Sequence, residues 1–309
     1  MIRVPNREFG LIPATLTPLD SKFNIDYDQL EKYISWILSF RIGGLAVNVD
    51  TGEGPQLYQE ERIRILSTVS GIAKGKVPIV AGLQARNTEE AVKFAIDAKQ
   101  AGANAVLVFP HPSFMGESSG DIIYDYHKQI SEIADIPIVL FSLQPVLGGV
   151  EYNPETLVTL AGIRNVVAIK EASFNARKFL DVVRTLKKAP RKITILTGND
   201  DFIYESLILG AEGGLLGFAT IAVKDQVEMF ELVGKRRYEE AREIWETKLL
   251  PLEKVLFATP VRDYRARIKE ALFQLGVLRS SFVRPPLQQI SAEERGKIHD
   301  ILNRLGVIA

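Results

Sequence analysis

Apolar and polar positions along this chain repeat one pattern: a short apolar run, a polar turn, and then a longer stretch with helical spacing. Short apolar runs with many β-branched residues are typical of strands that are buried on both faces of a parallel sheet. The pattern predicts eight strands, at residues 9–16, 45–49, 78–83, 105–109, 137–141, 166–170, 193–197 and 213–217.

Helical stretches follow the strands. Eight strand-helix units match a closed (β/α)8 TIM barrel in number and span. A doubly wound open sheet is the alternative, but it normally has fewer units, and no Gly-x-Gly-x-x-Gly segment opens the first helix. The predicted helices lie at residues 28–40, 59–73, 88–101, 121–135, 174–188 and 201–209, and one more starts after Pro154.

From residue 234 onward the strand pattern stops, and helices are predicted at residues 235–248, 261–275 and 292–305. The segment Arg284-Pro285-Pro286-Leu287 must be non-helical, because proline constrains its own backbone and that of its neighbour. The chain is therefore expected to consist of a barrel, residues 1–233, and a C-terminal helical region, residues 234–309. Apolar surface on the helical region could serve contacts between copies of the chain, so a homo-oligomer, a dimer or a tetramer, is expected.

Composition narrows the classes of function. A formal net charge of zero and a hydrophobic content of 46% describe a soluble globular protein, and neither nucleic acid nor a membrane is indicated as a partner. The chain has no cysteine, which excludes disulfides, thiol nucleophiles and cysteine metal sites. Its three histidines lie far apart, so a metal enzyme is not indicated, although carboxylate magnesium sites stay open. The polar N-terminus and the lack of a long apolar run favour a cytoplasmic location.

Lys170 lies where the sixth predicted strand stops and a loop begins. If Val167 and Ile169 pack outward against helices, then Val166, Ala168 and Lys170 share the inner face. A partly buried lysine has a lowered pKa and can form a Schiff base with a carbonyl substrate. The alternative is a lysine that extends its charge into solvent from a strand end. TIM-barrel sites lie at the carboxyl ends of the strands, here called the barrel mouth, and Lys170 is the only lysine there, which favours the catalytic role.

The second predicted strand ends in Asp50-Thr51-Gly52. A Thr-Gly pair at such a turn presents backbone N–H groups and a hydroxyl, which together can hold a small carboxylate. The alternative is a turn that needs glycine for its geometry, with Asp50 and Thr51 as caps. Strict alternation along this strand predicts three residues against the helices, Leu45, Val47 and Val49, and three inside the barrel, Ala46, Asn48 and Asp50.

Five segments together resemble one family, the pyruvate-dependent Schiff-base lyases typified by dihydrodipicolinate synthase and N-acetylneuraminate lyase. They occur in the family's order and at its spacing over nearly the whole chain. The segments are Pro13-Ala14-Thr15-Leu16-Thr17-Pro18, Thr51-Gly52-Glu53, Ile169-Lys170-Glu171-Ala172, Thr197-Gly198-Asn199-Asp200 and Val283-Arg284-Pro285-Pro286-Leu287.

The resemblance implies a (β/α)8 barrel with a C-terminal helical extension, commonly assembled as a tetramer. Lys170 matches the Schiff-base lysine, so the reaction would proceed through a covalent imine and need no cofactor. Thr51, followed by Gly52, matches a residue that holds the carboxylate of a 2-oxo acid such as pyruvate. Gly198 and Leu215 fall at positions that line the same pocket.

The chain also departs from the family pattern. Phe141 stands at the end of the fifth strand, where the family has a tyrosine that relays protons beside the imine, and phenylalanine has no ionisable group. Val146 and Leu147 occupy the region of the arginine that binds the second substrate in the synthase. Residues 142–145 replace an Asn-x-Pro segment, and residues 109–113 lack the tyrosine that the family supplies to a neighbouring subunit.

Asp50 occupies a position where the family usually has threonine or serine. A carboxylate beside the carboxylate of a 2-oxo acid is repulsive unless it is protonated or paired. Asp50 could therefore turn away, bridge to a cation such as Arg86, or replace the missing acid-base group. Three further residues could move protons or could be ordinary caps and solvated side chains: Glu53, His111 and Ser142.

These features predict an enzyme that condenses, cleaves or dehydrates a 2-oxo acid through an imine on Lys170. An aldolase or dehydratase for a 2-keto-3-deoxy sugar acid fits the altered pocket better than the synthase does. Three alternatives stay open: 4-hydroxy-tetrahydrodipicolinate synthase itself, a catalytically silent barrel that binds a 2-oxo acid, and a barrel that handles phosphate at the loops after strands seven and eight.

Overall fold

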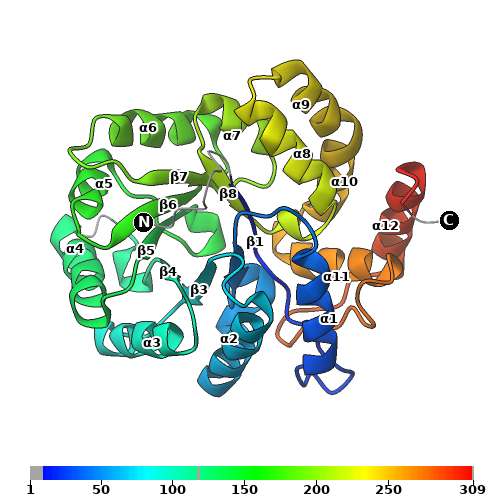
Figure 1. Cartoon of the computed structure of the whole chain (residues 1–309), viewed down its shortest axis with the longest axis horizontal. Helices are drawn as coiled ribbons and strands as arrows, with labels where there is room; N and C mark the ends of the chain where they lie inside the picture. Colours follow the sequence, from blue (N-terminus) through cyan, green and yellow to red (C-terminus); the bar gives the residue numbers. More distant parts are fainter. Residues whose placement is uncertain (1–9, 117–118, 308–309) are drawn as a thin grey trace.

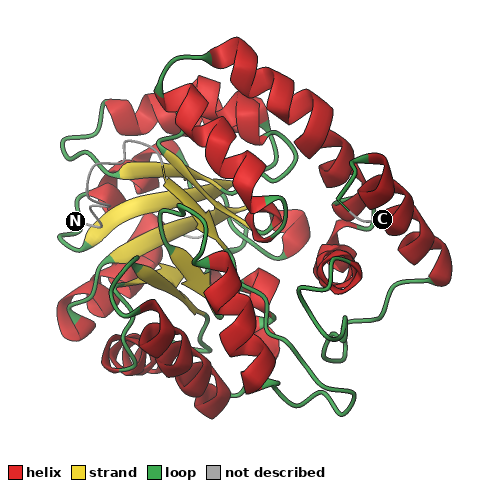
Figure 2. Ribbon diagram, turned by 45° about the vertical axis from the view of Figure 1, so that its right-hand side comes forward, coloured by secondary structure: helices red, strands yellow, loops and turns green. Residues whose placement is uncertain are grey.

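Eight parallel strands form the centre of the molecule (Figures 1 and 2), in a computed structural model that describes residues 10–116 and 119–307. Neighbouring strands pair in the order β1-β8-β7-β6-β5-β4-β3-β2, and a parallel bridge between Ala14 and Ala46 joins the first strand to the second. The strands are β1 (Gly10–Pro13), β2 (Leu45–Val47), β3 (Ile79–Leu83), β4 (Ala105–Val108), β5 (Ile138–Leu143), β6 (Val166–Ala172), β7 (Thr194–Thr197) and β8 (Gly213–Leu216).

Helices surround this barrel (Figure 2), so the predicted (β/α)8 TIM barrel is confirmed. The predicted helix at residues 59–73 is found with the same bounds. Asn87 caps the helix behind β3, and its side chain accepts a hydrogen bond from the backbone N–H of Glu90. The barrel helices are α1 (Tyr27–Ile37), α2 (Gln59–Ala73), α3 (Thr88–Gln100), α4 (Gly120–Gln129), α5 (Pro154–Ala161), α6 (Ala176–Lys187), α7 (Ile203–Leu209) and α8 (Val223–Gly234).

The C-terminal helices lie together at one side of the barrel, at the right of Figure 1. They are α9 (Tyr238–Ile244), α10 (Leu250–Leu256), α11 (Tyr264–Gln274) and α12 (Ala292–Arg304). Residues 284–287 are non-helical, as predicted. The proposed boundary at residues 233/234 stays a prediction, because one continuous hydrophobic core includes barrel and C-terminal residues. Over the described ranges, no helix is both long and apolar enough to cross a membrane.

Several predicted helix bounds differ from the structure, and two of them have an identifiable cause. The helix that was expected to end at residue 248 continues through a wider turn, Trp245–Leu249, into α10. Pro251 comes just after the wider turn, and the helix continues through it. Phe174, expected in a helix, precedes α6 and has a positive φ of 54°, and Asn175 caps that helix instead.

Side chains of the strands form two layers. An inner cluster fills the barrel, and an outer cluster joins the strands to the helices. Along β6, Ala168 lies in the inner cluster and Ile169 in the outer one, as alternation predicts. The expectation for the start of this strand is wrong, because Val166 packs outward and Val167 lies against the inner cluster. The pairing with β5 shifts by one residue at this point, so Val167 interrupts the alternation before the inner face reaches Lys170.

Candidate active site

Lys170 projects into the barrel from β6 and is 9% exposed. Its backbone pairs with Phe141 on β5 and Leu196 on β7, both members of the inner cluster. The ammonium nitrogen Nζ lies 4.4 Å from the centroid of the Phe141 ring. On the other side, Gly198 lies so close to the lysine stem that a Cβ there would be 2.5 Å from Lys170 Cε. The side chain is therefore held between β5 and β7.

Burial in this apolar setting lowers the pKa of Lys170, because a charged ammonium is poorly solvated there. The carboxylates of Asp200 and Asp50 oppose this effect as nearby charges, but the pKa still falls. A lowered pKa increases the share of neutral amine near pH 7, and the neutral amine is the nucleophile in Schiff-base formation.

Asp200 follows β7 and is buried beside the lysine. Its Oδ1 accepts a hydrogen bond of 2.8 Å from the backbone N–H of Phe218. Burial raises the pKa of Asp200 to about 7, although this hydrogen bond and Lys170 act in the opposite direction. The position of Asp200 after a strand end made it a candidate from the sequence, but the sequence assigned it no role.

Glu171 and Asn199 fix the loops that follow β6 and β7. The Asn199 amide donates to the Glu171 backbone oxygen at 3.0 Å and to its carboxylate at 2.8 Å. Asn199 Oδ1 accepts from the backbone N–H of Phe174 at 2.7 Å. Burial raises the pKa of Glu171, whereas these hydrogen bonds and those of Ser173 oppose the rise. The network holds the backbone on both sides of Lys170 in place.

The turn after β2 is the short 3-10 helix η1 (Asp50–Gly52). Thr51 is buried, and the hydroxyl of Thr17 donates to the Gly52 carbonyl at 2.7 Å. Gly52 packs against β1 so closely that a Cβ would lie 2.5 Å from the Thr15 carbonyl oxygen. Residue 52 must therefore be glycine for steric reasons. This requirement does not exclude a role of the turn in binding a carboxylate.

The predicted alternation at the end of β2 is wrong. Asn48 has a positive φ of 58°, and its side-chain amide donates to the backbone oxygen of Arg62 at 2.9 Å. Val49, expected against the helices, belongs to the inner cluster instead. A residue with left-handed backbone dihedral angles breaks the extended conformation of a strand. The inward and outward alternation of side chains therefore cannot be extended through Asn48.

Asp50 is paired, but not with Arg86. Its carboxylate accepts a hydrogen bond of 3.0 Å from the phenol of Tyr264 and forms an ion pair with Arg265, whose Nε also donates to the Asp50 carbonyl at 2.7 Å. Arg86 instead pairs with Glu90 at 2.6 Å. Tyr264 and Arg265 both come from α11, more than 200 residues away in sequence, and sequence reasoning missed them because no local pattern marks them.

Two of the other proton-transfer candidates, Glu53 and His111, form hydrogen bonds or ion pairs that favour a structural role. Glu53 forms a buried ion pair with Lys269 and accepts from the backbone N–H of Arg284 at 2.7 Å. His111 caps a turn, since its Nδ1 accepts from the Ser113 backbone N–H at 3.1 Å. Ser142 follows Phe141 on β5, where alternation directs it away from the inner cluster that contains Phe141.

The structure thus brings most of the predicted site residues to one end of the barrel. Lys170 lies against Phe141 on one side and against Gly198 on the other. Leu215 belongs to the inner cluster. It follows Gly214, whose backbone pairs with Thr197 on β7. Asp50 and Thr51 stand across the barrel from β6, at the end of β2. The negative charge of Asp50 acts to raise the pKa of Lys170, although the two side chains form no ion pair.

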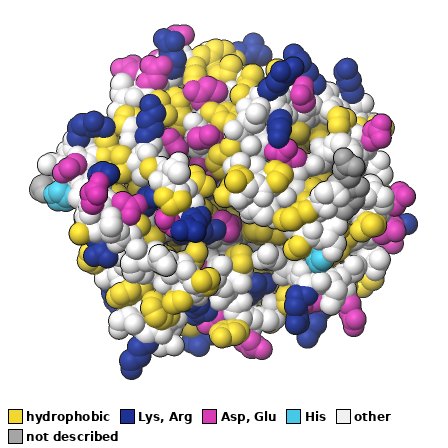
Figure 3. All heavy atoms as spheres, turned by 180° about the vertical axis from the view of Figure 1, so that it is seen from behind, with side chains coloured by type: hydrophobic (Ala, Val, Ile, Leu, Met, Phe, Trp, Pro, Cys, Tyr) yellow, Lys and Arg dark blue, Asp and Glu magenta, His cyan; other side chains and the backbone are white. Residues whose placement is uncertain are grey.

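Figure 3 shows the face of the molecule opposite to that in Figure 1. Basic and acidic side chains are interspersed over this face, in keeping with the zero net charge. Near its centre, Lys or Arg side chains lie beside a hollow in which hydrophobic side chains are visible. Among the described residues, no group of three or more His, Asp or Glu could hold a metal ion.

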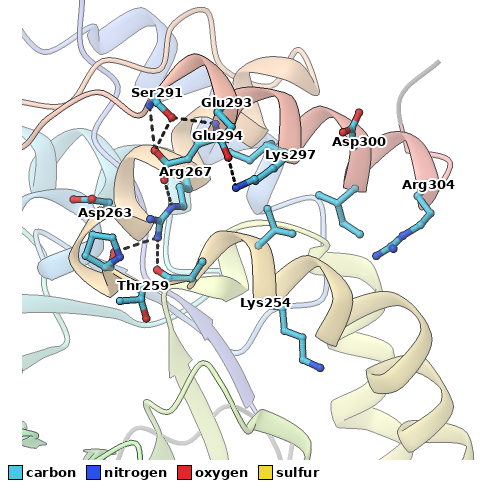
Figure 4. Close-up of a pocket in the computed structure, with 15 residues that line it drawn as sticks. Lys254, Thr259, Asp263, Arg267, Ser291, Glu293, Glu294, Lys297, Asp300 and Arg304 are labelled. Carbon is cyan, nitrogen blue, oxygen red and sulfur yellow. Dashed lines mark hydrogen bonds and ion pairs between the residues drawn. The ribbon is translucent and has the colours of Figure 1, made fainter.

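A separate cleft of about 660 Å³ lies between α10, α11 and α12 (Figure 4). Arg267 crosses it and is only 2% exposed, since it donates to Glu294 Oε1 at 2.9 Å and to the Ala258 carbonyl at 2.6 Å. No strand end contributes to this cleft. The polar groups of this cleft bind one another and connect the C-terminal helices, which indicates a structural role. We therefore place the candidate active site at the barrel mouth, beside Lys170.

Comparison with known proteins identifies the family of this chain. The chain matches the dihydrodipicolinate synthetase family over residues 8–305. It belongs to this family. Within the family, the 4-hydroxy-tetrahydrodipicolinate synthase of Methanocaldococcus jannaschii is 30% identical over 300 residues, which cover 97% of this chain and 99% of the relative.

Two solved structures of dihydrodipicolinate synthases extend the match to three dimensions. The enzyme from Acinetobacter baumannii, complexed with pyruvate, is 26% identical and has a TM-score of 0.86 over 97% of this chain and 99% of that one. A monomeric dihydrodipicolinate synthase variant is 29% identical, with a TM-score of 0.89 over 98% and 99% of the two chains. The family resemblance drawn from five short segments is therefore confirmed.

Proposed function

We propose that this chain is a Schiff-base-forming lyase that acts on a 2-oxo acid, such as pyruvate, through Lys170. The observation that carries the proposal is a buried amine with a lowered pKa at the barrel mouth, which Asp200 and Asp50 influence as charges without a hydrogen bond. The related synthase from Acinetobacter baumannii was solved in complex with pyruvate, which supports this class of substrate.

In the proposed reaction the Lys170 amine attacks the keto carbon, and loss of water gives a protonated imine. The imine withdraws electrons, so the adjacent carbon can lose a proton, a hydroxyl or an aldehyde. At the end of β2, the turn at Thr51 and Gly52 would hold the substrate carboxylate through the Thr51 backbone N–H, because the Gly52 N–H already donates to the Val49 carbonyl at 3.1 Å. Phe141, Gly198 and Leu215 would enclose the reacting carbon atoms. The covalent imine supplies the electron sink, so the proposal needs neither a metal nor another cofactor.

Within this class, we favour an aldolase or dehydratase for a 2-keto-3-deoxy sugar acid. The loop after β5 presents Pro145, Val146 and Leu147, and Val146 is 81% exposed. This loop offers no cation to clamp the second carboxylate of an aldehyde substrate. Phe141 also removes the hydroxyl that the family tyrosine would supply.

Relatives named 4-hydroxy-tetrahydrodipicolinate synthase at 30% identity favour that reaction as a second candidate. Coupled turnover with pyruvate and aspartate semialdehyde distinguishes it from the sugar-acid reactions. A catalytically silent barrel would instead show thermal stabilisation by 2-oxo acids without turnover on any of them.

Borohydride reduction in the presence of pyruvate tests the central step. We expect reduction to attach the pyruvate carbons covalently to Lys170, detected by mass spectrometry of the digested protein. Lys170→Met should abolish the label, whereas Lys178→Met, which changes an exposed lysine paired with Glu151, should leave it unchanged. An unlabelled wild-type protein at saturating pyruvate would contradict the proposal.

We also propose that the chain forms a homo-oligomer. Large apolar side chains are exposed on the C-terminal helices, with Tyr238 44% and Phe273 45% exposed. One of the solved relatives is described as monomeric, so the fold alone does not set the number of subunits. Light scattering coupled to size exclusion would measure it. The cytoplasmic location stays a prediction.

A further inference from the structure

Phe141 leaves the proposed chemistry without its proton carrier. Imine formation moves protons between the lysine nitrogen and the keto oxygen, and a phenylalanine ring can neither donate nor accept them. A phenol does lie at the barrel mouth, but it comes from α11 rather than from β5. We propose that Tyr264 relays protons at this site and that Asp50 accepts and returns them. This inference rests on the function proposed above.

Three side-chain oxygens form a continuous chain. Tyr264 Oη donates to Asp50 Oδ2 at 3.0 Å and lies 3.1 Å from Thr51 Oγ1. A phenol has a single hydrogen, and here it is directed to the carboxylate. The Thr51 hydroxyl must therefore donate to Tyr264, which leaves its own lone pairs free to accept a proton from a substrate. The chain has a direction, from the substrate through Thr51 and Tyr264 to Asp50.

Packing fixes the phenol at this place. The Tyr264 ring stacks on Phe257 with a centroid distance of 4.9 Å and an interplanar angle of 18°. Gly217, which follows β8, lies beside the contact between Thr51 and Tyr264. A Cβ at this position would be 3.0 Å from Thr51 Oγ1 and 3.0 Å from Tyr264 Cε2. A larger residue at this position would separate Tyr264 from Thr51. The close contact therefore depends on an open space that glycine provides.

The surrounding charges suit a neutral relay. Arg265 forms an ion pair with Asp50, which stabilises the carboxylate when it holds no proton. Burial and the charges of Asp50 and Asp200 raise the pKa of Tyr264 well above its usual value, although Arg265 and Thr51 oppose the rise. The phenol consequently stays protonated and passes one proton on as it receives another. It does not need to become a phenolate.

The protons balance with one proton from solvent and no other reactant. Attack of the neutral Lys170 amine on the keto carbon forms a C–N bond and leaves a surplus proton on nitrogen and a negative oxygen. The chain takes one proton from nitrogen, delivers it to Asp50, and returns it to the oxygen. That hydroxyl departs as water with the second proton of the Lys170 nitrogen, which leaves a neutral C=N imine and Asp50 as a carboxylate. One proton from solvent then gives the protonated imine. The same chain can remove and return a proton at the adjacent carbon.

Proton exchange at the methyl carbon of pyruvate, followed by NMR in D2O, tests the relay separately from imine formation. Tyr264→Phe should slow the exchange about 100-fold, within the range that a positioned acid-base group contributes. The final yield of borohydride labelling at Lys170 should stay at the wild-type level. Tyr204→Phe is the matched control, because it removes a hydroxyl that donates at 3.1 Å to the Tyr238 carbonyl, away from η1.

Asp50→Asn provides a second variant in case Tyr264→Phe does not fold, and it should slow exchange similarly because an amide cannot accept the proton. Wild-type labelling together with undiminished exchange in both variants overturns the relay. An equal loss of labelling and exchange in Tyr264→Phe shows that Tyr264 only positions Thr51, and also overturns it. A wild-type protein that pyruvate and borohydride leave unlabelled overturns the proposed function itself.

Discussion

Gly198 defines how closely the barrel surrounds its lysine. It follows β7 directly, and a Cβ added to it would meet Lys170 at Cε and at Cγ, at 2.5 and 2.9 Å. Lys170 could yield only by moving toward the Phe141 ring, which is already 4.4 Å from Nζ. The absence of a side chain at residue 198 thus positions the amine.

Gly198→Ala should displace Lys170 and reduce the rate of borohydride labelling with pyruvate at least tenfold. Overpacking of this kind also costs about 1–3 kcal/mol of unfolding free energy. Gly71→Ala is the control, because Gly71 lies in α2 and a Cβ there meets nothing within 4 Å. In the control, labelling should be unchanged and stability should rise by about 1 kcal/mol. Equal labelling rates in both variants would show that Gly198 does not position the lysine.

At the scale of elements, α11 connects the C-terminal helical region to the turn after β2. Its first residues, Tyr264 and Arg265, bind Asp50 in η1. One turn further along, Lys269 pairs with Glu53, and both side chains are only 1% exposed. Lys269 also donates to the Phe282 carbonyl at 2.7 Å. The helix therefore completes the barrel mouth from outside the strand-helix repeat.

Glu53→Gln should destabilise the protein by about 3–5 kcal/mol, because it leaves the Lys269 ammonium buried without its counter-charge. Urea unfolding would measure this loss. The exposed pair of Lys297 and Glu293 serves as comparison, since its side chains are 62% and 76% exposed and Lys297→Ala should cost under about 1 kcal/mol. Glu53→Leu combined with Lys269→Met should regain most of the stability. A Glu53→Gln loss no larger than that of Lys297→Ala would argue against this anchoring role.

At the scale of the whole molecule, ionisable groups buried in the mouth link stability to pH. Burial raises the pKa of Asp200 to about 7, from 3.8 for an unperturbed carboxyl. Between these two values the folded state binds more protons than the unfolded state, so its stability falls as the pH rises. The difference in pKa corresponds to about 4 kcal/mol lost between pH 4 and pH 7.

Asp200→Asn should remove this dependence, because an amide does not titrate and its oxygen can still accept from the Phe218 backbone N–H. Urea unfolding at pH 4.5 and at pH 8 would measure the effect. We expect similar unfolding free energies for variant and wild type at the lower pH, and a more stable variant at the higher pH. A stability difference that is the same at both pH values would mean that Asp200 does not titrate in this range.

The architecture and the position of the lysine follow from the amino-acid pattern alone. Strand and helix periods are local properties, because each records which face of an element is buried. Eight repeats of one unit therefore predicted the barrel, and the barrel placed Lys170 at the mouth. Periodicity failed where the backbone departs from a regular element, at the positive φ of Asn48 and at the shifted pairing beside Val167.

The surroundings of the lysine depend on long-range packing, which the pattern does not contain. The sequence left three possibilities open for Asp50, which could turn away, bridge to a cation such as Arg86, or replace the missing acid-base group. The fold supplies Arg265 and Tyr264 instead, from positions 215 and 214 residues further along the chain. A hydrophobic pattern specifies that a face is covered, but not which distant side chain reaches it. That choice depends on how α11 packs against the end of β2, and this packing is a property of the assembled barrel.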